Sequence, residues 1–379
     1  MRLLDIEIQN FRNLSSVRLE LGEGVNYFWG ENGAGKTALL EAVCVLARGR
    51  SFRSGHAADL VASGQDAFTV RASFLDEHRG TQSVAVMRSR SGRSRLKLNG
   101  EPGKRLSDVA RVLPVQVLLP SLSELVFGSP VERRRWLDWG LFHVKPDYLR
   151  TLREYLQLLK QRNAALKSFA RGDLPQSGID VWTRKLVIIA EQLDTQRRDY
   201  MGDAVAETLN VLRLLSPGLE IAVRYQRGWS ETESLEKVLS DSQARDVKLG
   251  ATSAGPHRSD IELSAGPAFG SRASVILSRG QGKLLASAMV LGQASLLMRV
   301  SNRNSVFLID DLGAEMDQQH SAALFRILRE MSSQILATST HPLGESRTPT
   351  LTPEAMFHVE QGKVSVRPRE ESTIFPEAT

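Results

Sequence analysis

Apolar and polar residues alternate at the beginning of the chain, over residues 4–9 and again over residues 17–21. This period of two predicts two half-buried strands. Residues 25–29, VNYFW, are nearly all apolar, as expected of a third strand that is covered on both faces. That strand runs directly into GENGAGKT at 30–37, and the good helix formers ALLEAVCVLA follow until Gly49 ends the helix. The predicted order is therefore strand, glycine-rich loop and helix.

The middle of the chain changes character twice. Residues 68–117 carry many strand signals, with SVAVM and RLKLNG as the arms of a hairpin. Helical periodicity then dominates from Ser129, which can cap a helix with Pro130 in its first turn. Two long helical arms, about 148–170 and 179–215, are long enough to pack as an antiparallel hairpin.

Strand signals return after the helical region, and an α/β pattern occupies 275–341. VEQGKVSV near 359–366 predicts a closing hairpin. We therefore expect one α/β fold whose sequence is split by a helical insertion. The expected segments are an α/β lobe at 1–128, a helical lobe at 129–217, the return of the α/β lobe at 218–367 and a loose tail at 368–379.

The segment at 30–37 fits the phosphate-binding pattern G-x-x-x-x-G-K-[ST] at every position. In such a loop the glycines let backbone N–H groups turn toward phosphate oxygens, and the next helix adds its positive N-terminal end. Lys36 would reach the β- and γ-phosphates and act in catalysis, and the Thr37 hydroxyl would bind Mg²⁺. The candidate nucleotide-binding residues of this loop are Gly30, Glu31, Asn32, Gly33, Ala34, Gly35, Lys36 and Thr37.

A second candidate site lies at 306–311, where the apolar run VFLI ends in two carboxylates. Asp310 would hold Mg²⁺, directly or through water. Asp311 would orient or deprotonate the attacking water. ATP and Mg²⁺ are therefore the expected cofactors.

Composition narrows the class of protein. Of the 379 residues, 41% are hydrophobic and 24% are charged, which is ordinary for a soluble globular protein. No run approaches eighteen consecutive apolar residues, and the N-terminal pattern is that of a strand rather than of a secretion signal. The single cysteine, Cys44, suits a reducing cytoplasm. We expect a cytoplasmic protein with no membrane partner.

The net charge of +6 and the pI of about 9.5 favour a polyanionic partner. Arg133, Arg134 and Arg135 are consecutive, and a second basic group lies within ten residues that contain no acid. This second group consists of Arg88, Arg90, Arg93, Arg95 and Lys97. Nucleic acid is the leading class of partner, and we expect the second group to contact DNA.

Several motifs together resemble a known family. LSRGQGK at 277–283 resembles the signature motif of ABC-type ATPases, with Arg279 in a glycine position, and IQNFRN at 8–13 resembles the start of SMC-type heads. Six segments in order along the chain narrow the resemblance to the RecF family of bacterial recombination mediators. They are ENGAGKT at 31–37, RGRSFR at 48–53, RRRWLDW at 133–139, AGPHRSD at 254–260, LSRGQGK at 277–283 and DDLGAEMD at 310–317.

The resemblance implies an α/β P-loop ABC-type ATPase head, SMC-like but without a long coiled coil, with an inserted helical lobe. It implies a protein that binds ATP, dimerises around it, clamps single- or double-stranded DNA and works with RecR and RecO to direct recombinase to gaps. Ser278 and Gly280 would contact the γ-phosphate held by the other subunit, and Arg12 would contact the nucleotide. The segment at 315–317 would cross the dimer seam. Because Asp311 stands where transporter ATPases carry the longer Glu, we expect slow hydrolysis that DNA stimulates.

Some residues keep two interpretations. His341 can sense phosphate, as the switch histidine of transporter ATPases does, or lie out of reach because three residues separate it from the preceding strand. His257 and Arg258 can contact DNA or nucleotide, or form the turn into a strand at 261–263. Gln116 is a candidate for a nucleotide contact near 120–123, where PSLS departs from the family's usual Pro-Glu-Asp-Leu.

Two other functions fit parts of the sequence. The first is an SMC-like structural scaffold that binds ATP without hydrolysing it, although the intact acidic pair at 310–311 argues against it. The second is a transporter-type ATPase subunit, which the segment at 8–13 and the basic clusters do not suit.

Overall fold

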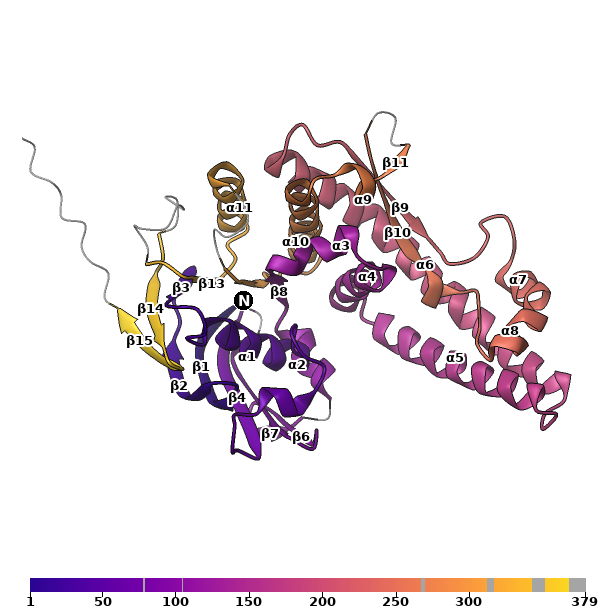
Figure 1. The fold of residues 1–379 in the computed structure, drawn as a ribbon, viewed down its shortest axis with the longest axis horizontal. Coiled ribbons are helices and arrows are strands. Elements are labelled where there is room, and N and C mark those ends of the chain that lie inside the picture. The colour runs from indigo at the N-terminus through magenta and orange to yellow at the C-terminus, as the bar shows by residue number, and fades with distance from the viewer. Residues whose placement is uncertain (78, 104, 267–269, 312–316, 343–351, 368–379) are drawn as a thin grey trace, which may run out of the picture. The chain divides into compact units, whose positions relative to one another are not determined.

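The computed structural model of this chain describes residues 1–77, 79–103, 105–266, 270–311, 317–342 and 352–367 (Figure 1). The expected tail at 368–379 lies outside the described residues. The chain forms two compact units: Met1–Ser121 together with Ser301–Thr379, and Leu122–Val300.

One sheet of the first unit is antiparallel and contains the alternating strands from the beginning of the chain. Alternation buries one face of it, with Ile6 and Ile8 fully covered. In spatial order the strands are β2 (Leu14–Glu20), β1 (Arg2–Phe11), β4 (Ala67–Asp76), β5 (Gly80–Ser89), β6 (Ser94–Leu98) and β7 (Glu101–Pro102). The predicted hairpin of SVAVM and RLKLNG is confirmed, because β5 pairs with β6.

The other sheet of the first unit is mostly parallel and holds the nearly all-apolar strands. In spatial order the strands are β15 (Lys363–Arg367), β14 (Ala355–Glu360), β3 (Val25–Trp29), β13 (Ile335–Ser339), β12 (Val306–Ile309) and β8 (Val115–Leu118). Neighbouring strands are parallel except β14 and β15, which form the predicted closing hairpin. The carboxyl ends of β3, β12 and β13 therefore meet at one edge, where α/β sheets bind ligands.

Helix α1 (Lys36–Arg48) contacts strands of both sheets and is buried along almost its whole length. A helix that is apolar all round suits this place between two layers. Gly49 ends it in the left-handed conformation, with φ of 69°. Helix α2 (Leu106–Val112) packs against α1, and α11 (Gln318–Glu330) connects β12 to β13.

The second unit contains a long helical pair and a small sheet. Helices α5 (Tyr148–Ala170) and α6 (Gln176–Leu215) pack against each other, which confirms the two predicted helical arms. The antiparallel sheet is formed by β11 (Ser271–Arg272), β10 (Asp260–Ala265) and β9 (Ile221–Gln226). The other helices are α3 (Glu124–Phe127), α4 (Pro130–Val144), α7 (Leu235–Asp241), α8 (Gln243–Leu249), α9 (Ala273–Ile276) and α10 (Arg279–Ser301).

The boundary expected near 217 does not coincide with a boundary between the two units. Strand β9 contacts α6 and β10 contacts α4, so residues 218–300 belong to the second unit. The inserted helices α6 and α4 therefore cover part of these strands. Helix α10 is long and apolar enough to cross a membrane, but 72% of its most apolar window is buried, as in a core helix of a folded protein.

Candidate nucleotide-binding site

The glycine-rich loop follows β3 and enters α1 in the order that the sequence predicted. Gly30, Gly33 and Gly35 all have positive φ angles, of 156°, 80° and 120°. A Cβ atom at Gly30 would lie 2.0 Å from the Val359 carbonyl oxygen, so only glycine fits there. The turn between β14 and β15 also holds the loop, because Gly362 donates its N–H to the Ala34 carbonyl at 2.8 Å.

Lys36 lies in the first turn of α1 and is buried. Its ammonium donates to the carbonyl oxygens of Gly30 and Glu31, at 2.6 and 2.8 Å, so it lies across the loop. Burial lowers the pKa of Lys36, while the nearby charges of Asp311 and Asp310 raise it. These two acids are the counter-charges of the lysine inside the site.

Thr37 and Asp310 meet across 273 residues of sequence. The Thr37 hydroxyl lies 3.0 and 3.1 Å from the two carboxylate oxygens of Asp310. A hydroxyl and a carboxylate are the hard oxygen ligands that Mg²⁺ prefers. Among the described residues no group of three or more His, Cys, Asp or Glu side chains could hold a metal ion. The chemistry of the Thr37–Asp310 pair fits a Mg²⁺ ion, a metal that usually keeps waters and takes phosphate oxygens as further ligands.

Asp311 follows directly and has a left-handed backbone, with φ of 57°. The N–H of Asp311 donates to the Thr338 hydroxyl at 2.9 Å, and the same hydroxyl lies 2.8 Å from Asp310 Oδ1. In the sequence, Thr338 was only one of the three residues between the expected strand and His341. A hydroxyl at the carboxyl end of a strand, on the sheet edge where a phosphate loop lies, was the signal that could have identified it.

A cavity of about 680 Å³ brings these residues together within the first unit. Of the predicted site residues, it is lined by Arg12, Asn32, Gly33, Gly35, Lys36, Thr37, Asp310 and Asp311. The residues that sequence reasoning did not assign to it are Asn13, Ala38, Arg53, Asp59, Val61, Pro120, Thr338 and Thr340. Pro120 lies in the PSLS segment and Arg53 in the RGRSFR segment, but their position at the cavity depends on the tertiary fold.

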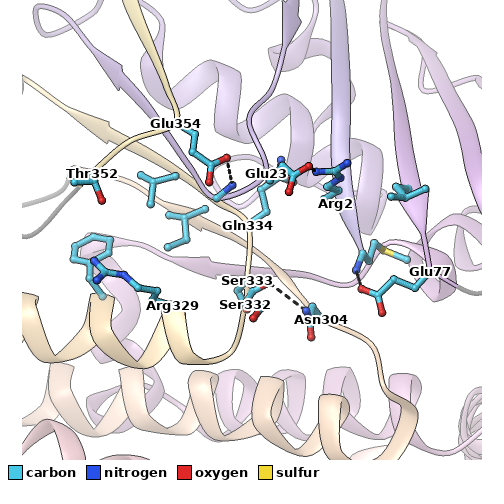
Figure 2. Close-up of a pocket in the computed structure, with 16 residues that line it drawn as sticks. Arg2, Glu23, Glu77, Asn304, Arg329, Ser332, Ser333, Gln334, Thr352 and Glu354 are labelled. Carbon is cyan, nitrogen blue, oxygen red and sulfur yellow. Dashed lines mark hydrogen bonds and ion pairs between the residues drawn. The ribbon is translucent and has the colours of Figure 1, made fainter. Parts of the chain in front are cut away.

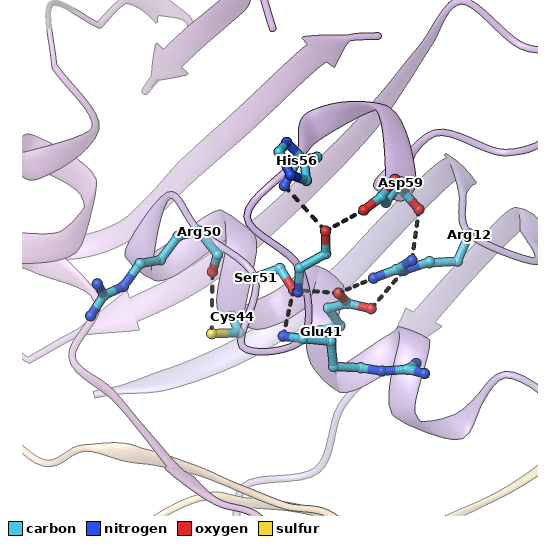
Figure 3. Close-up of polar contacts among 9 residues, drawn as sticks. Arg12, Glu41, Cys44, Arg50, Ser51, His56 and Asp59 are labelled. Carbon is cyan, nitrogen blue, oxygen red and sulfur yellow. Dashed lines mark hydrogen bonds and ion pairs between the residues drawn. The ribbon is translucent and has the colours of Figure 1, made fainter. Parts of the chain in front are cut away.

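Arg12 lines the cavity while its guanidinium is anchored by an acid of α1 (Figure 3). It donates to both carboxylate oxygens of Glu41, at 2.9 and 2.7 Å, and to the Asp59 carbonyl at 2.7 Å. Glu41 is fully buried and also accepts a hydrogen bond from Ser51. The Glu41 hydrogen bond raises the pKa of Arg12. Ser51 of the RGRSFR segment thus helps to hold Glu41, which in turn holds Arg12.

His341 and Gln116, whose roles the sequence left undecided, do not line the cavity. His341 is exposed and is not among the residues that line it, whereas Thr338 and Thr340 are. Gln116 is buried in β8, where its amide oxygen accepts a hydrogen bond from Arg48 at 3.1 Å. Gln116 therefore lies within the sheet and does not line the candidate site.

The signature residues belong to the second unit, at the start of α10. Ser278 and Gln281 form a reciprocal cap: the Gln281 N–H donates to the Ser278 hydroxyl at 3.2 Å, and the Ser278 N–H donates to Gln281 Oε1 at 3.0 Å. Ser278 and Gly280 are exposed beside this helix N-terminus. In the expected seam loop, Asp317 caps α11 through His320, and residues 312–316 lie outside the described residues.

The strand register separates the five basic residues that we expect to contact DNA. Arg95 and Lys97 are exposed on the solvent-facing side of the antiparallel sheet. Lys97 pairs with Ala85 and Ala85 with Arg71, so exposed Arg71 lies in the same cross-strand row. We call Arg71, Arg95 and Lys97 the open-face cations; Arg93 lies in the hairpin turn outside this set.

Arg88 and Arg90 make hydrogen bonds within the first unit instead. Arg88 donates to the Gly49 carbonyl at 3.0 Å, and burial lowers its pKa. Arg90 donates to the carbonyl oxygens of Gln65 and Ala62, each at 2.7 Å. Both guanidinium groups therefore hold loops of the protein.

The other basic cluster is also used internally. Arg133 makes two hydrogen bonds to the Asp260 carboxylate, at 2.7 and 3.0 Å, and Arg134 donates to the Ser259 carbonyl at 2.7 Å. His257 is hydrogen-bonded to Tyr155 and to the Thr252 carbonyl. The AGPHRSD segment is thus tied into the second unit, which supports the turn interpretation of His257, whereas Arg258 is exposed.

A second cavity of the first unit, of about 570 Å³, lies at the amino ends of β3 and β13 (Figure 2). Charged groups on its wall pair with one another: Arg2 with Glu23, and the Met1 ammonium with Glu77. Its lining includes no residue of the glycine-rich loop and neither acid of the 310–311 pair. The first cavity is therefore the candidate site for a nucleotide.

Comparison with known proteins covers all of these motifs. Residues 2–353 match the family model for the RecF/RecN/SMC N terminal domain. The chain is 36% identical over 366 residues to the DNA replication and repair protein RecF of Shewanella loihica, across 97% of this chain and 99% of that protein. It is 36% identical over 367 residues to the protein of the same name from Shewanella oneidensis, with the same coverage.

Solved structures show the same fold. The chain is similar to the recombination mediator protein RecF with ATP in the RecFOR pathway, with a TM-score of 0.86 and 24% identity over 97% of this chain and 98% of that one. It is also similar to an Smc head bound to the C-winged helix domain of ScpA, with a TM-score of 0.59 and 17% identity over 98% of both chains. The expected SMC-type α/β head is therefore confirmed.

Proposed function

Since this chain belongs to the RecF family within the RecF/RecN/SMC group, we propose that it is an ATP-dependent DNA-binding protein of DNA replication and recombinational repair. Its curated relatives carry the description of DNA replication and repair proteins. We propose the cytoplasm as its location, because its DNA partner lies there in bacteria.

The observation that carries the ATP proposal is the 3.0 Å contact between Thr37 and Asp310 beside the buried Lys36. It brings together a loop of backbone N–H donors, a cation and two acids at the N-terminus of α1, which favours a nucleotide triphosphate. Thr37 and Asp310 would hold Mg²⁺, which would neutralise charge on the β- and γ-phosphates. Lys36 would bind the same phosphates.

Asp311 is the proposed general base for hydrolysis. It lines the cavity next to Asp310, and a carboxylate there can orient a water molecule or accept its proton. Because the side chain is shorter than that of Glu, the water would lie less close to it, and turnover would be slow. Hydrolysis would then time the release of DNA.

For DNA, the proposed surface is the face of the antiparallel sheet that carries the open-face cations. Two of them, Arg95 and Lys97, are in the basic group found from the sequence, and Arg71 joins them through the strand register. Contacts to phosphates need no base sequence and suit single- and double-stranded DNA alike. Arg88 and Arg90 are left out of this proposal because their guanidinium groups donate to backbone carbonyls of the unit. Arg71 is kept because its side chain is largely exposed, although it lies 3.6 Å from the carboxylate of Glu7.

Assembly is proposed on the basis of the signature residues. Ser278 and Gly280 are exposed at the N-terminus of a long helix, where an anion is favoured. We propose that they contact the γ-phosphate of a second copy, so that ATP closes a homodimer. RecR and RecO are the proposed protein partners, through membership of the family, and no membrane partner is proposed.

ATP turnover measured with and without DNA tests this proposal. We expect slow hydrolysis that DNA accelerates, and Asp311→Asn should abolish it while the protein still binds ATP. The same preparations should bind DNA more tightly with ATP than without it. ATP binding with no turnover in the presence of DNA would instead support a structural scaffold, and turnover with no affinity for DNA would support a transporter-type subunit.

A further inference from the structure

Thr338 occupies a position from which one side chain reaches both acids of the nucleotide site. It lies near the end of β13, and the register pairs Ala337 with Ile309, so Thr338 is level with Asp310 on the neighbouring strand. The side chain is fully buried at 0% exposure and lines the cavity. A buried hydroxyl in such a place must have its hydrogen-bonding groups satisfied within the protein.

The chemistry of the groups fixes the direction of both hydrogen bonds. A carboxylate only accepts, so the Thr338 O–H donates to Asp310 Oδ1 at 2.8 Å. A backbone N–H only donates, so the Asp311 N–H donates to the Thr338 oxygen at 2.9 Å. One hydroxyl group therefore ties the carboxylate of Asp310 to the peptide group of Asp311.

The second of these bonds holds an uncommon backbone conformation. Asp311 has φ of 57°, a left-handed value that aspartate tolerates but does not favour. This conformation turns the chain at the end of β12 and leaves the Asp311 side chain on the wall of the cavity. The hydrogen bond from its N–H to Thr338 stabilises that turn.

Thr37 also holds the carboxylate of Asp310. The Thr37 hydroxyl lies 3.0 Å from Oδ1 and 3.1 Å from Oδ2 of Asp310. Oδ1 thus receives both threonine hydroxyls, while Oδ2 faces Thr37 alone among the contacts of the described residues. The two threonine hydroxyls together fix the orientation of the carboxylate.

We propose that Thr338 is a positioning residue for ATP hydrolysis, which holds the carboxylate of Asp310 and the backbone of Asp311 in their working geometry. The inference rests on the proposed ATPase function. Threonine and serine can make both bonds, and valine, which has the same shape, can make neither. His341 does not line the cavity, so the side chain at this strand end that reaches the acids is a hydroxyl and not an imidazole.

The test compares Thr338→Val with Thr338→Ser in the full-length protein. A small misplacement of reacting groups costs up to about 100-fold in rate, so Thr338→Val should lower kcat by about 10- to 100-fold. The KM for ATP should change little, because Lys36 and the loop remain. Thr338→Ser should restore most of the rate. Ser339→Ala is the matched control, since it removes a buried hydroxyl from the next position of β13 and should leave kcat near the wild-type value.

A second readout needs neither nucleotide nor metal. Hydrogen exchange of the Asp311 amide in the nucleotide-free protein should be faster in Thr338→Val and unchanged in Thr338→Ser and Ser339→Ala. If the wild type hydrolyses no ATP, the proposed function fails, but the exchange measurement still decides the role of Thr338. Wild-type kcat and wild-type exchange in Thr338→Val would overturn the inference. Should Thr338→Val not fold, Thr338→Ala is measured in the same way with the same expected results.

Discussion

His257 lies inside the second unit with both ring nitrogens engaged. Nδ1 is 2.6 Å from the Tyr155 hydroxyl, and Nε2 is 3.0 Å from the Thr252 carbonyl oxygen. Because a carbonyl only accepts, Nε2 carries the proton and Nδ1 accepts from Tyr155. Burial lowers the pKa of His257, the Thr252 hydrogen bond opposes that shift, and the charge of Arg258 adds to it. The imidazole is therefore neutral in the folded protein.

This geometry predicts a loss of stability in mild acid. As pH falls below about 6.5, His257 takes up a proton in the unfolded chain, whereas the folded protein resists protonation until a lower pH. The free energy of unfolding should therefore fall from about pH 6.5 downward and level off below the folded pKa. His257→Gln offers an amide oxygen and an N–H in place of the two ring nitrogens, so its decline should be smaller. Urea unfolding at a series of pH values measures both, and an identical decline would contradict the assignment.

The sequence predicted those residues of the candidate site that belong to a short motif. The residues of the loop at 30–37 are consecutive in sequence, and so are the acids at 310–311. The structure brings Thr37 of the loop to Asp310. Thr338 and Glu41 could not be assigned in this way, because their partners are far away in the chain and no local spacing connects them. The basic run at Arg133 and Arg134 suggested a nucleic-acid contact for the same reason, since the Asp260 carboxylate and the Ser259 carbonyl that they bond lie more than a hundred residues away.

The period of two predicted the strands, but the faces of the β5–β6 hairpin depend on the turn between them. Arg88 pairs with Ser94 and Met87 with Arg95, so Arg88 and Arg95 point to opposite faces. A turn one residue longer would reverse the faces of β6. The run of basic residues therefore indicated a positively charged hairpin, but it could not indicate the face of the sheet to which each side chain points.

If DNA binds the face that carries the open-face cations, variants on the two faces of the hairpin should differ in their effect on DNA binding. Replacing Arg71, Arg95 and Lys97 by Gln removes the open-face cations, and DNA affinity should become less dependent on salt. Each DNA phosphate that the variant no longer neutralises lowers the slope of log affinity against log salt by roughly one unit. ATP affinity should be unchanged.

The control for that experiment is Arg88→Gln with Arg90→Gln. These residues hold carbonyl groups within the first unit, so the expected effect is a loss of thermal stability with the salt slope preserved. The reverse result, a flatter slope in the control and none in the triple variant, would move the DNA surface to the other side of the sheet.

The residues proposed to bind ATP from the two copies of the chain belong to different units of the fold. Lys36, Thr37 and Asp310 are in the first unit, and Ser278 and Gly280 are in the second. The sequence predicted an inserted helical lobe but placed the signature helix outside it. Helix α10 is apolar on nearly all sides and therefore gives no indication of which layer covers it. Packing with distant helices, and not local pattern, decides such a boundary.

Ser278→Arg tests whether ATP joins two copies of the chain. Its expected contact is with the γ-phosphate of the partner, while every contact proposed within one copy comes from residues of the first unit, so one copy should still bind ATP. ATP-dependent dimerisation should be lost, because a bulky cation replaces the small hydroxyl at the seam.

Ser240→Arg, on an exposed serine of α7 in the same unit, is the matched control and should dimerise normally. Mixing Ser278→Arg with Lys36→Ala should restore at most one competent site per dimer. Sedimentation with ATP and Mg²⁺ measures the outcome, and dimerisation of Ser278→Arg at the wild-type level would mean that the site works within a single subunit.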